Sequence, residues 1–382
     1  MGRAGGRRRV LMAGSCVSVG GVGVAWARDG AWDGASVRPG RRPGPGPACS
    51  CHDDGAGTTT AGHGPDGRAA VTVAVVGAGI AGAACARVLA QAGCDVRLLD
   101  RGRVPGGRMA SRRLEGRYVD LGASYFTCRD AEFTAVVDDW VARGLARPWT
   151  DAFHVATPHG LGERKSGPVR YGAAGGLRSL VEDLLDGQAV SQAVTVGSVG
   201  PGPTVDGTAY DAVVLAMPDP QALQLLHPSL QDARAAVADR RWDPVLALAA
   251  GFATRAWADD FDGCFVDDSD VLSWVADDGR RRGDGAPVLV AHSTPAYAAG
   301  HLVDPAGATD DLVAALRGVL DVGEPTWSRV QRWTFAKPAG PRDELFHLSS
   351  GVGLCGDGWG ASKVEAAWLS GTRLGQALTA PQ

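Results

Sequence analysis

The segment VAVVGAGIAG, residues 73–82, constrains the fold more than any other part of the chain. Its short apolar run breaks into Gly77, Gly79 and Gly82, and the AACARVLAQAG that follows carries apolar residues at helical spacing. This pattern predicts a buried strand, a tight glycine turn and a helix. In such a turn the first glycine permits the bend, the second lets a pyrophosphate approach the backbone, and the third lets the helix pack on the strand.

A second short apolar segment, DVRLLD, ends at Asp100. An acidic residue at this place can accept hydrogen bonds from the hydroxyls of an adenosine ribose, and it repels a 2′-phosphate. Ile80 and Ala81, at the predicted start of the helix, would offer N–H groups at the positive end of the helix dipole to the phosphates. The order of strand, glycine turn, helix, strand and acidic residue therefore predicts a dinucleotide site rather than an ordinary β–α–β turn.

The composition is that of a globular protein and excludes several classes of function. The 382 residues are 45% hydrophobic and 21% charged, enough for one large or two ordinary domains. The net charge of −4 argues against nucleic acid as the main partner. No apolar run reaches the length of a membrane-spanning helix, so no membrane span is predicted. The eight cysteines lack the spacing of a disulfide scaffold or a metal site, and we predict no metal.

Residues 1–70 differ in composition from the rest of the chain. They hold 17 glycines and 5 prolines without sustained apolar periodicity, which predicts a disordered segment. Arg7, Arg8 and Arg9 precede a weakly apolar run that reaches Ala27, a pattern that resembles a twin-arginine export signal. The alternative is a cytoplasmic protein whose start lies later in the chain, near Val71. We favour the cytoplasmic location and keep export through residues 1–27 as the alternative.

The middle of the chain predicts two kinds of structure. Helical spacing predicts a helix in residues 131–149 and another after Gly176, and apolar runs predict strands over 192–199 and 210–218. Strands and helices in this order indicate a doubly wound sheet. Residues 221–333 instead alternate apolar segments with acidic turns, which predicts a mainly antiparallel sheet with a helix over 309–320. The predicted fold is α/β, with a doubly wound cofactor domain (residues 71–122, 168–220 and 334–382) and an inserted α+β substrate domain (residues 123–167 and 221–333).

The last part of the chain carries a second strong signal. GVGLCGDGWG predicts a strand that ends at Gly356 and Asp357, and ASKVEAAWLSGTRLGQAL predicts a helix after it. An acidic residue so far from the glycine turn requires a cofactor long enough to be held at both ends, which favours FAD over NAD. We expect Asp357 to bind the ribityl or phosphate region, and the helix start near Val364 and Glu365 to offer N–H groups to the flavin pyrimidine ring.

A basic turn follows the ribose acid. Arg101 comes directly after Asp100, and PGGRMASRR then places Gly107 and Arg108 a few residues further on. Flexible backbone followed by a guanidinium at this spacing can meet a phosphate or the far end of a long cofactor. The alternative is a solvated basic turn.

Seven pieces of the chain together resemble a known family. In order they are VAVVGAGIAG, PGGRMASRR, VDLGASYFTCRD, AMPDPQA, RRWDPVLALAAGF, RWTFAKPAG and LCGDGWGASKVEAAWLSG. They are similar to bacterial renalases, which belong to the flavin amine-oxidase superfamily with a p-hydroxybenzoate-hydroxylase-like architecture. The resemblance implies noncovalent FAD and oxidation of isomeric (2- or 6-) dihydro-NAD(P), with hydride passing to the flavin and electrons to O₂ to give H₂O₂.

The resemblance also implies roles for individual residues. Those implied to hold the cofactor are Gly77, Gly79 and Gly82 at the pyrophosphate, Asp100 at the ribose, Arg101 and Arg108 along the cofactor, Val194 near the adenine, and Asp357, Val364 and Glu365 at the flavin end. Hydride transfer requires orientation more than an acid or a base, so no catalytic residue is assigned. Our candidates for the substrate pocket are Tyr125, Phe126, His292 and Trp333, and each is equally compatible with a place in the core.

Two other functions remain open from the sequence. One is a flavin amine oxidase acting on a small amine, which we rank lower because such enzymes often place a lysine near the flavin and the chain has three lysines, at 165, 337 and 363. The other is a non-catalytic dinucleotide-binding module. The isomer preference, the choice between NAD and NADP, and the oligomeric state are not predicted.

Overall fold

The computed structural model describes residues 70–380, which belong to one compact unit of the chain. The predictions of disorder or an export signal for the N-terminal segment fall on residues outside this range, apart from residue 70. Within residues 70–380 no helix combines the length and the apolar character needed to cross a membrane.

A six-stranded sheet forms the first body of the fold, in the order β17-β18-β11-β1-β2-β7. All neighbouring strands are parallel except β17 and β18, which confirms the predicted doubly wound α/β fold. The central strand β1 is apolar throughout because both of its faces are covered: Val73 and Val75 face one core, and Ala74 and Val76 face another. The strands are β1 (Thr72–Val76), β2 (Asp95–Leu99), β7 (Val190–Ser191), β11 (Ala212–Ala216), β17 (His347–Ser349) and β18 (Val352–Cys355).

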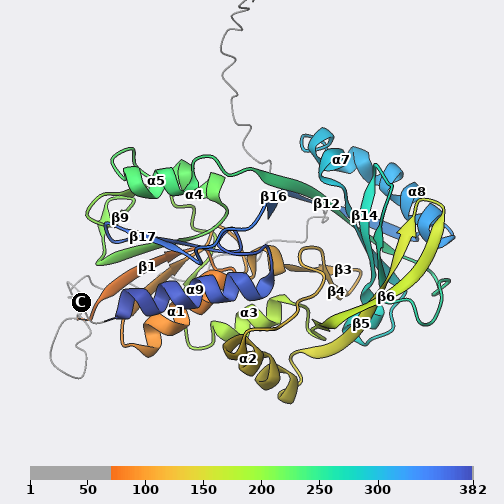
Figure 1. Ribbon diagram of the computed structural model, residues 1–382, viewed down its shortest axis with the longest axis horizontal. Coiled ribbons are helices and arrows are strands. Elements are labelled where there is room, and N and C mark those ends of the chain that lie inside the picture. Colours follow the sequence, from red (N-terminus) through yellow and green to blue (C-terminus); the bar gives the residue numbers. More distant parts are fainter. Residues whose placement is uncertain (1–69, 381–382) are drawn as a thin grey trace, which may run out of the picture. The chain divides into compact units, whose positions relative to one another are not determined.

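Helices cover both faces of this sheet, as Figure 1 shows. One core holds side chains of α1 (Ile80–Gln91), α2 (Ala131–Ala142), α3 (Arg178–Leu184) and α9 (Val364–Thr379). The core on the other face holds side chains of α4 (Asp219–Leu225), α5 (Gln231–Val237) and the small sheet of β8 (Val199–Gly200), β9 (Thr204–Val205) and β10 (Thr208–Ala209). This arrangement leaves the carboxyl ends of β1, β11 and β18 at one edge, where the predicted cofactor residues follow the strands.

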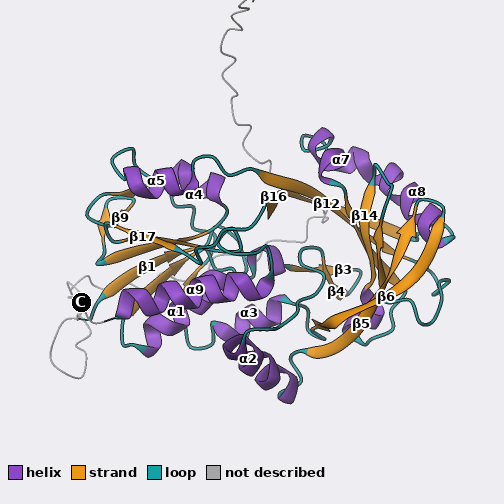
Figure 2. Ribbon diagram, in the orientation of Figure 1, coloured by secondary structure: helices purple, strands orange, loops and turns teal. Residues whose placement is uncertain are grey.

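A seven-stranded sheet forms the second body, in the order β16-β12-β15-β14-β13-β5-β6 (Figure 2). Its strands are antiparallel apart from the parallel pair β5 and β13. The strands are β5 (Arg147–Thr157), β6 (Gly160–Gly172), β12 (Trp242–Gly251), β13 (Gly263–Val266), β14 (Leu272–Asp277), β15 (Val288–Ser293) and β16 (Trp327–Pro338). The prediction of a mainly antiparallel sheet is confirmed.

The two faces of the seven-stranded sheet meet different neighbours. One face packs against α7 (Pro295–Gly300), the short 3₁₀ helix Ala306–Ala308 and α8 (Thr309–Leu320), and α8 begins and ends at the predicted residues. The other face packs against Val119 and Leu121, in and just after the hairpin of β3 (Ser111–Leu114) and β4 (Arg117–Asp120). A short helix, α6 (Asp278–Arg282), follows β14.

The structure differs from one predicted strand and from two predicted domain boundaries. The strand predicted over 192–199 is wrong: only Val190–Ser191 and Val199–Gly200 pair, because Ala193 has a positive φ of 57° that breaks the extended conformation. The predicted domain boundaries at 167/168 and 333/334 fall inside β6 and β16, which are 13 and 12 residues long. The division into a cofactor and a substrate domain is kept as a proposal.

Candidate functional site

The glycine turn after β1 has no room for a side chain at Gly77 or Gly82 but has open space at Gly79. Gly77 has a φ of 109°, and a side chain there would meet the carbonyl oxygen of Ala216 at 2.5 Å. A side chain at Gly82 would clash with the carbonyl oxygen of Gly77, so α1 packs directly on the turn. At Gly79 there is no neighbouring atom within 4 Å of an added Cβ, and no side chain caps α1. The turn therefore presents free N–H groups and open space, as a bound pyrophosphate requires.

Asp100 and the segment around Val194 lie beside this turn. The Asp100 carboxylate accepts hydrogen bonds from the backbone N–H of Ala78 at 2.6 Å and of Gly102 at 2.5 Å. Each carboxylate oxygen has a second lone pair, so binding of a ribose hydroxyl stays a prediction that this geometry permits. The backbone N–H of Val194 donates to the carbonyl of Asp100 at 2.9 Å, which places Val194 next to Asp100. Arg101 is exposed beside them.

The basic turn folds over the glycine turn. Gly106 donates its N–H to the carbonyl of Ala78 at 2.8 Å, and a side chain at Gly107, whose φ is 52°, would lie 3.3 Å from the Cα of Gly79. The turn ends in the 3₁₀ helix Gly107–Met109. Arg108 is thereby carried to the edge where β18 ends.

Arg108 and Asp357 meet there as a two-point ion pair. The guanidinium nitrogens lie 2.9 and 2.6 Å from the two carboxylate oxygens. Arg108 also donates to the carbonyl of Ala336 in β16 at 3.2 Å and lies over the ring of Trp242 at 5.0 Å. Gly356, which has a φ of 143°, makes the turn that presents Asp357. The two predicted cofactor segments, far apart in sequence, are thus in direct contact.

Helix α9 runs alongside α1 and extends beyond it. A side chain at Gly371 would clash with the carbonyl of Ala81 near the start of α1, and one at Gly375 would crowd Cys85 and Val88, so the helices are parallel and very close (Figure 1). Val364 begins α9 seven residues before Gly371, so the α9 start lies about 10 Å beyond the α1 start at 1.5 Å per residue. No side chain caps α9. Its free N–H groups therefore point past the pyrophosphate site, where the flavin end of FAD would lie.

The side chain of Glu365 is engaged outside the predicted cofactor site, which leaves only its backbone N–H for a cofactor. Its carboxylate accepts hydrogen bonds from the N–H groups of Arg129 at 2.5 Å and Asp130 at 2.8 Å, and so fixes the start of α2. Taken together, the open turn at Gly79, the Arg108–Asp357 pair and the uncapped start of α9 fit FAD. Within the described part of the chain, no three His, Cys, Asp or Glu side chains come together as metal ligands.

The four predicted pocket residues separate into two groups. Phe126 is corrected to a core residue: it is buried, stacks on Tyr171 and meets Phe133 and Trp140 edge-on. It follows Tyr125 in an extended segment, so the two side chains point to opposite sides. Tyr125, His292 and Trp333 instead lie at the face of the seven-stranded sheet that is turned toward β3 and β4.

That face carries one continuous row of side chains across six strands. Directly paired residues share a face, and the pairings connect Gln331, Ala247, His292, Trp274, Phe265 and Val155 in that order. Trp333 lies two residues beyond Gln331 on the same strand and face, and its indole N–H donates to the carbonyl of Leu121 at 2.6 Å. The row therefore begins close to the Arg108 turn, because Ala123 donates its N–H to the carbonyl of Arg108 at 2.9 Å.

Sequence reasoning missed an aromatic cluster at the other end of this row. The Tyr125 ring lies 6.3, 5.3 and 5.6 Å from the rings of Trp149, Phe153 and Trp274. The guanidinium of Arg170 lies over the Phe153 ring at 4.3 Å. The strands that carry these residues are far apart in sequence, and only an arginine between apolar residues in VRYG hinted at an unusual position.

Unpartnered polar atoms concentrate in the same region. Six buried side-chain nitrogen or oxygen atoms of the described residues lack a hydrogen-bond partner. Four of them lie on this face or on residues packed against it: Trp149 Nε1, Arg170 Nη1, Arg281 Nε and His292 Nε2. Such atoms are rare in native proteins and indicate a place for water or a ligand.

His292 is uncharged at neutral pH. Its pKa is lowered to about 3, chiefly by burial and also by Lys337 and Arg281, which repel a second positive charge. Below pH 6.5 an unfolded chain takes up a proton that the folded protein refuses until near pH 3, so the native state loses stability as the pH falls through this range.

We therefore expect His292→Gln to reduce the acid sensitivity of the protein. The wild type should lose up to about 1.4 kcal/mol more per pH unit than the variant between pH 6.5 and pH 3. Urea unfolding of both proteins along this range measures the difference. Parallel stability curves for the two proteins would contradict the buried, neutral state.

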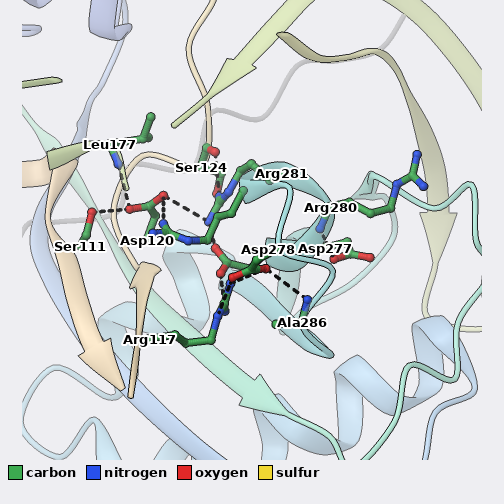
Figure 3. A network of polar contacts seen from close by, with 12 residues as sticks. Ser111, Arg117, Asp120, Ser124, Leu177, Asp277, Asp278, Arg280, Arg281 and Ala286 are labelled. Carbon is green, nitrogen blue, oxygen red and sulfur yellow. Dashed lines mark hydrogen bonds and ion pairs between the residues drawn. The ribbon is translucent and has the colours of Figure 1, made fainter. Parts of the chain in front are cut away.

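A buried network of charges holds the segment that leads to Tyr125 (Figure 3). Asp120 accepts hydrogen bonds from Ser111 Oγ at 2.5 Å, from the N–H of Leu177 at 3.1 Å and from Arg282 at 3.2 Å. Burial raises the pKa of the Asp120 carboxyl, and the guanidinium of Arg281, 3.7 Å away, opposes that rise.

Arg281 connects this network to the aromatic face. It is fully buried, pairs with Asp278, and donates to the carbonyl of Ser124 at 2.7 Å. Ser124 Oγ in turn accepts from the indole of Trp274 at 3.1 Å. The network thus fixes residues 120–125 between the seven-stranded sheet and the edge of the six-stranded sheet where β1, β11 and β18 end.

Comparison with known proteins places these features in a wider group. Residues 154–378 match the sequence model of the family described as flavin-containing amine oxidoreductase, and residues 75–140 match the NAD(P)-binding Rossmann-like domain. A hydroxyneurosporene desaturase of Rubrivivax gelatinosus is 49% identical over 57 residues, which are 15% of this chain and 11% of the desaturase. The chain thus spans about a tenth of that relative's length.

Solved structures share the fold. A double mutant of putrescine oxidase matches with a TM-score of 0.66 and 16% identity, over 82% of this chain and all of that one. Cyclohexylamine oxidase from Brevibacterium oxydans IH-35A matches with a TM-score of 0.66 and 13% identity, over 81% of this chain and 99% of that one. At these identities the likeness concerns the fold, and the fold is that of FAD-binding oxidoreductases.

Proposed function

Because the chain belongs to the flavin-containing amine oxidoreductase family, we propose that it is an FAD-dependent oxidase of isomeric (2- or 6-) dihydro-NAD(P), in which noncovalently bound FAD accepts the hydride and passes electrons to O₂ to give H₂O₂. The family membership makes the protein a flavin-dependent oxidoreductase with FAD as its cofactor. The substrate is the part that we propose.

The roles proposed for the cofactor residues follow the geometry of the edge. Gly77, Gly79 and Gly82 would hold the pyrophosphate, with Ile80 and Ala81 supplying helix N–H groups. Asp100 and Val194 would flank the adenosine, with Arg101 at the rim. The Arg108–Asp357 pair and the start of α9 at Val364 and Glu365 would hold the flavin end.

One observation carries the choice of substrate. The unpartnered buried atoms of Trp149, Arg170 and Arg281 are all N–H donors, and the fourth belongs to a neutral histidine. A small amine is itself a cation and donor, so these atoms would remain unpartnered or repel it. A dihydronicotinamide dinucleotide offers carbonyl and phosphate oxygens, which accept hydrogen bonds from such donors.

The residues of the aromatic face would act by orienting the substrate. Tyr125, Trp274 and Trp333 present rings on which a flat dihydropyridine can lie, and His292 can donate or accept one hydrogen bond without adding charge. Hydride transfer needs the donor carbon held at the right distance and angle, and no side chain need move a proton in that step.

Anaerobic mixing of the purified holoprotein with 2-dihydro-NAD or 6-dihydro-NAD tests the proposal. We expect the visible flavin absorbance to bleach within a single turnover, and admission of O₂ to restore it with one H₂O₂ per flavin. Ordinary 4-dihydro-NAD serves as the control and should bleach the flavin far more slowly. A flavin that stays oxidised with both isomers would sink the proposal.

A flavin amine oxidase is the second candidate, because the family match and the putrescine oxidase-like fold favour it. Lys337 is close enough to His292 to lower its pKa, and Lys165 pairs directly with Phe153, so two lysines lie near the proposed substrate face. The same experiment separates the candidates: bleaching by putrescine or cyclohexylamine, with none by either isomer, would establish this alternative. A flavin that no substrate bleaches would favour a non-catalytic module.

A further inference from the structure

We propose that Arg170 anchors an anionic group of the substrate, a phosphate of the dinucleotide, at the aromatic end of the substrate face. This inference rests on the proposed function and assigns one residue to the recognition of its substrate. It would make Arg170 a residue that determines specificity, remote from the site of hydride transfer.

Arg170 is a buried guanidinium without a counter-charge. It lies in β6, is 9% exposed, and its Nη1 has no hydrogen-bond partner. Among residues 70–380 no carboxylate lies within ion-pair distance of it, whereas Arg164 on the same strand pairs with Asp262 at 3.0 Å. A buried charge that lacks a partner is strongly destabilising, so proteins rarely retain one unless a ligand supplies the opposite charge.

The surroundings of Arg170 fix its orientation. The guanidinium stacks on Phe153, and its strand position pairs directly with Thr150, next to Trp149. Trp149 Nε1 is a second buried donor that lacks a partner. Burial raises the pKa of Tyr125, and the charge of Arg170 and its side-chain hydrogen bond to the phenol oppose that rise, so the phenol lies beside the guanidinium and leaves Nη1 without a partner.

The chemistry of these donors selects an oxyanion. A guanidinium is planar and always charged, and its fork of N–H groups can bind phosphate or carboxylate at two points. The indole N–H adds one further donor. Neither the guanidinium nor the indole N–H can accept a hydrogen bond, so a cationic amine finds no acceptor in these two groups. Under the proposed function the oxyanion is a phosphate, and a carboxylate is the competing source that the experiment must separate.

Arg170→Met tests the anchor, with Arg170→Lys and Arg164→Gln as companions. For the wild type and each variant, kcat/KM is measured with the active dihydro isomer as the phosphate-bearing mononucleotide and as the uncharged riboside. We expect Arg170→Met to reduce the preference for the phosphate-bearing form about 10- to 100-fold through KM, since a hydrogen-bonded charge pair is lost. Arg170→Lys should recover part of it, and Arg164→Gln should keep the full preference.

Stability and cofactor content distinguish an anchor from a structural role. Arg170→Met removes an unpaired buried charge, so its melting temperature should equal or exceed that of the wild type, with unchanged FAD absorbance. A lower melting temperature together with an equal loss on both substrates would overturn the proposal. So would an unchanged preference.

Binding without reaction separates this proposal from the proposed function. If neither isomer bleaches the flavin, the proposed reaction fails, and titration calorimetry of the holoprotein with NAD⁺ and with nicotinate then tests the anchor. Binding of NAD⁺ that Arg170→Met weakens supports a phosphate anchor. Binding of NAD⁺ that the variant leaves unchanged overturns it, as does an Arg170-dependent response to nicotinate alone, which would identify a carboxylate.

Discussion

Replacing Gly79 with alanine should abolish FAD binding while leaving the folded protein as stable as the wild type. An added Cβ at Gly79 meets no atom of the protein, and the residue has an ordinary φ of −81°. Its methyl group would instead stand where the pyrophosphate approaches the backbone. We expect a purified variant without flavin absorbance, FAD affinity weakened at least about 100-fold, and a free energy of unfolding of the apoprotein within about 1 kcal/mol of the wild type.

Gly82→Ala is the matched variant, because its methyl group would clash with the backbone of Gly77. That variant should lose both FAD and stability. Thermal unfolding of the two apoproteins, with FAD binding followed by fluorescence quenching, gives the comparison. Retained FAD in Gly79→Ala would mean that the pyrophosphate does not lie over this turn.

Asp120→Ala should destabilise the protein by about 3 to 5 kcal/mol, because it removes one partner from a buried charge network. Asp120 is 1% exposed, and its loss leaves Arg282, Ser111 Oγ and the N–H of Leu177 without their acceptor. Arg281 keeps Asp278 but loses a second negative charge. Urea unfolding of the holoprotein measures the cost.

Asp139→Ala is the control for this prediction. Asp139 forms an ion pair with Arg143 at 2.7 Å, but its side chain is 60% exposed, and exposed pairs contribute little. We expect its unfolding curve to overlay that of the wild type. A comparable loss in both variants would show that burial of the Asp120 network is not what stabilises it.

The local parts of the fold were predictable from sequence, and so was the position of the candidate cofactor residues directly after β1, β2 and β18. The glycine turn, Asp100, and the strand that ends at Asp357 each carry their signal within about ten residues, because turn chemistry and helix starts depend on neighbouring residues. The helix predicted over residues 309–320 has the same first and last residues in the structure, for the same reason. Where local geometry is unusual, as at Ala193 with its positive φ, the apolar pattern alone misleads.

The face of the seven-stranded sheet that we propose to bind substrate could not be predicted in the same way. It depends on which strands pair and in which register, and β5 joins the sheet beside β13, which lies about a hundred residues later in the chain. A shift by one residue sends a side chain to the opposite face, which is the difference between Tyr125 in the aromatic cluster and Phe126 in the core. The sequence does not show that Arg170 is unusual, because its lack of a carboxylate partner becomes visible only when its neighbours in the folded protein are known.

Helix α9 packs in parallel on α1 but is synthesised much later, so the parts of the proposed cofactor site become available in a fixed order during translation. The ribosome finishes α1 early, and at roughly 5 to 20 residues per second it takes about 15 to 60 s more to reach Val364, where α9 begins. During that interval the nascent chain acquires Asp100, Arg108, Val194 and Asp357, but not the N–H groups at the start of α9. Under the proposed roles, firm capture of the cofactor comes only after α9 has docked through Gly371 and Gly375, and a protein that has lost α9 should fail to retain flavin even with its glycine turn intact.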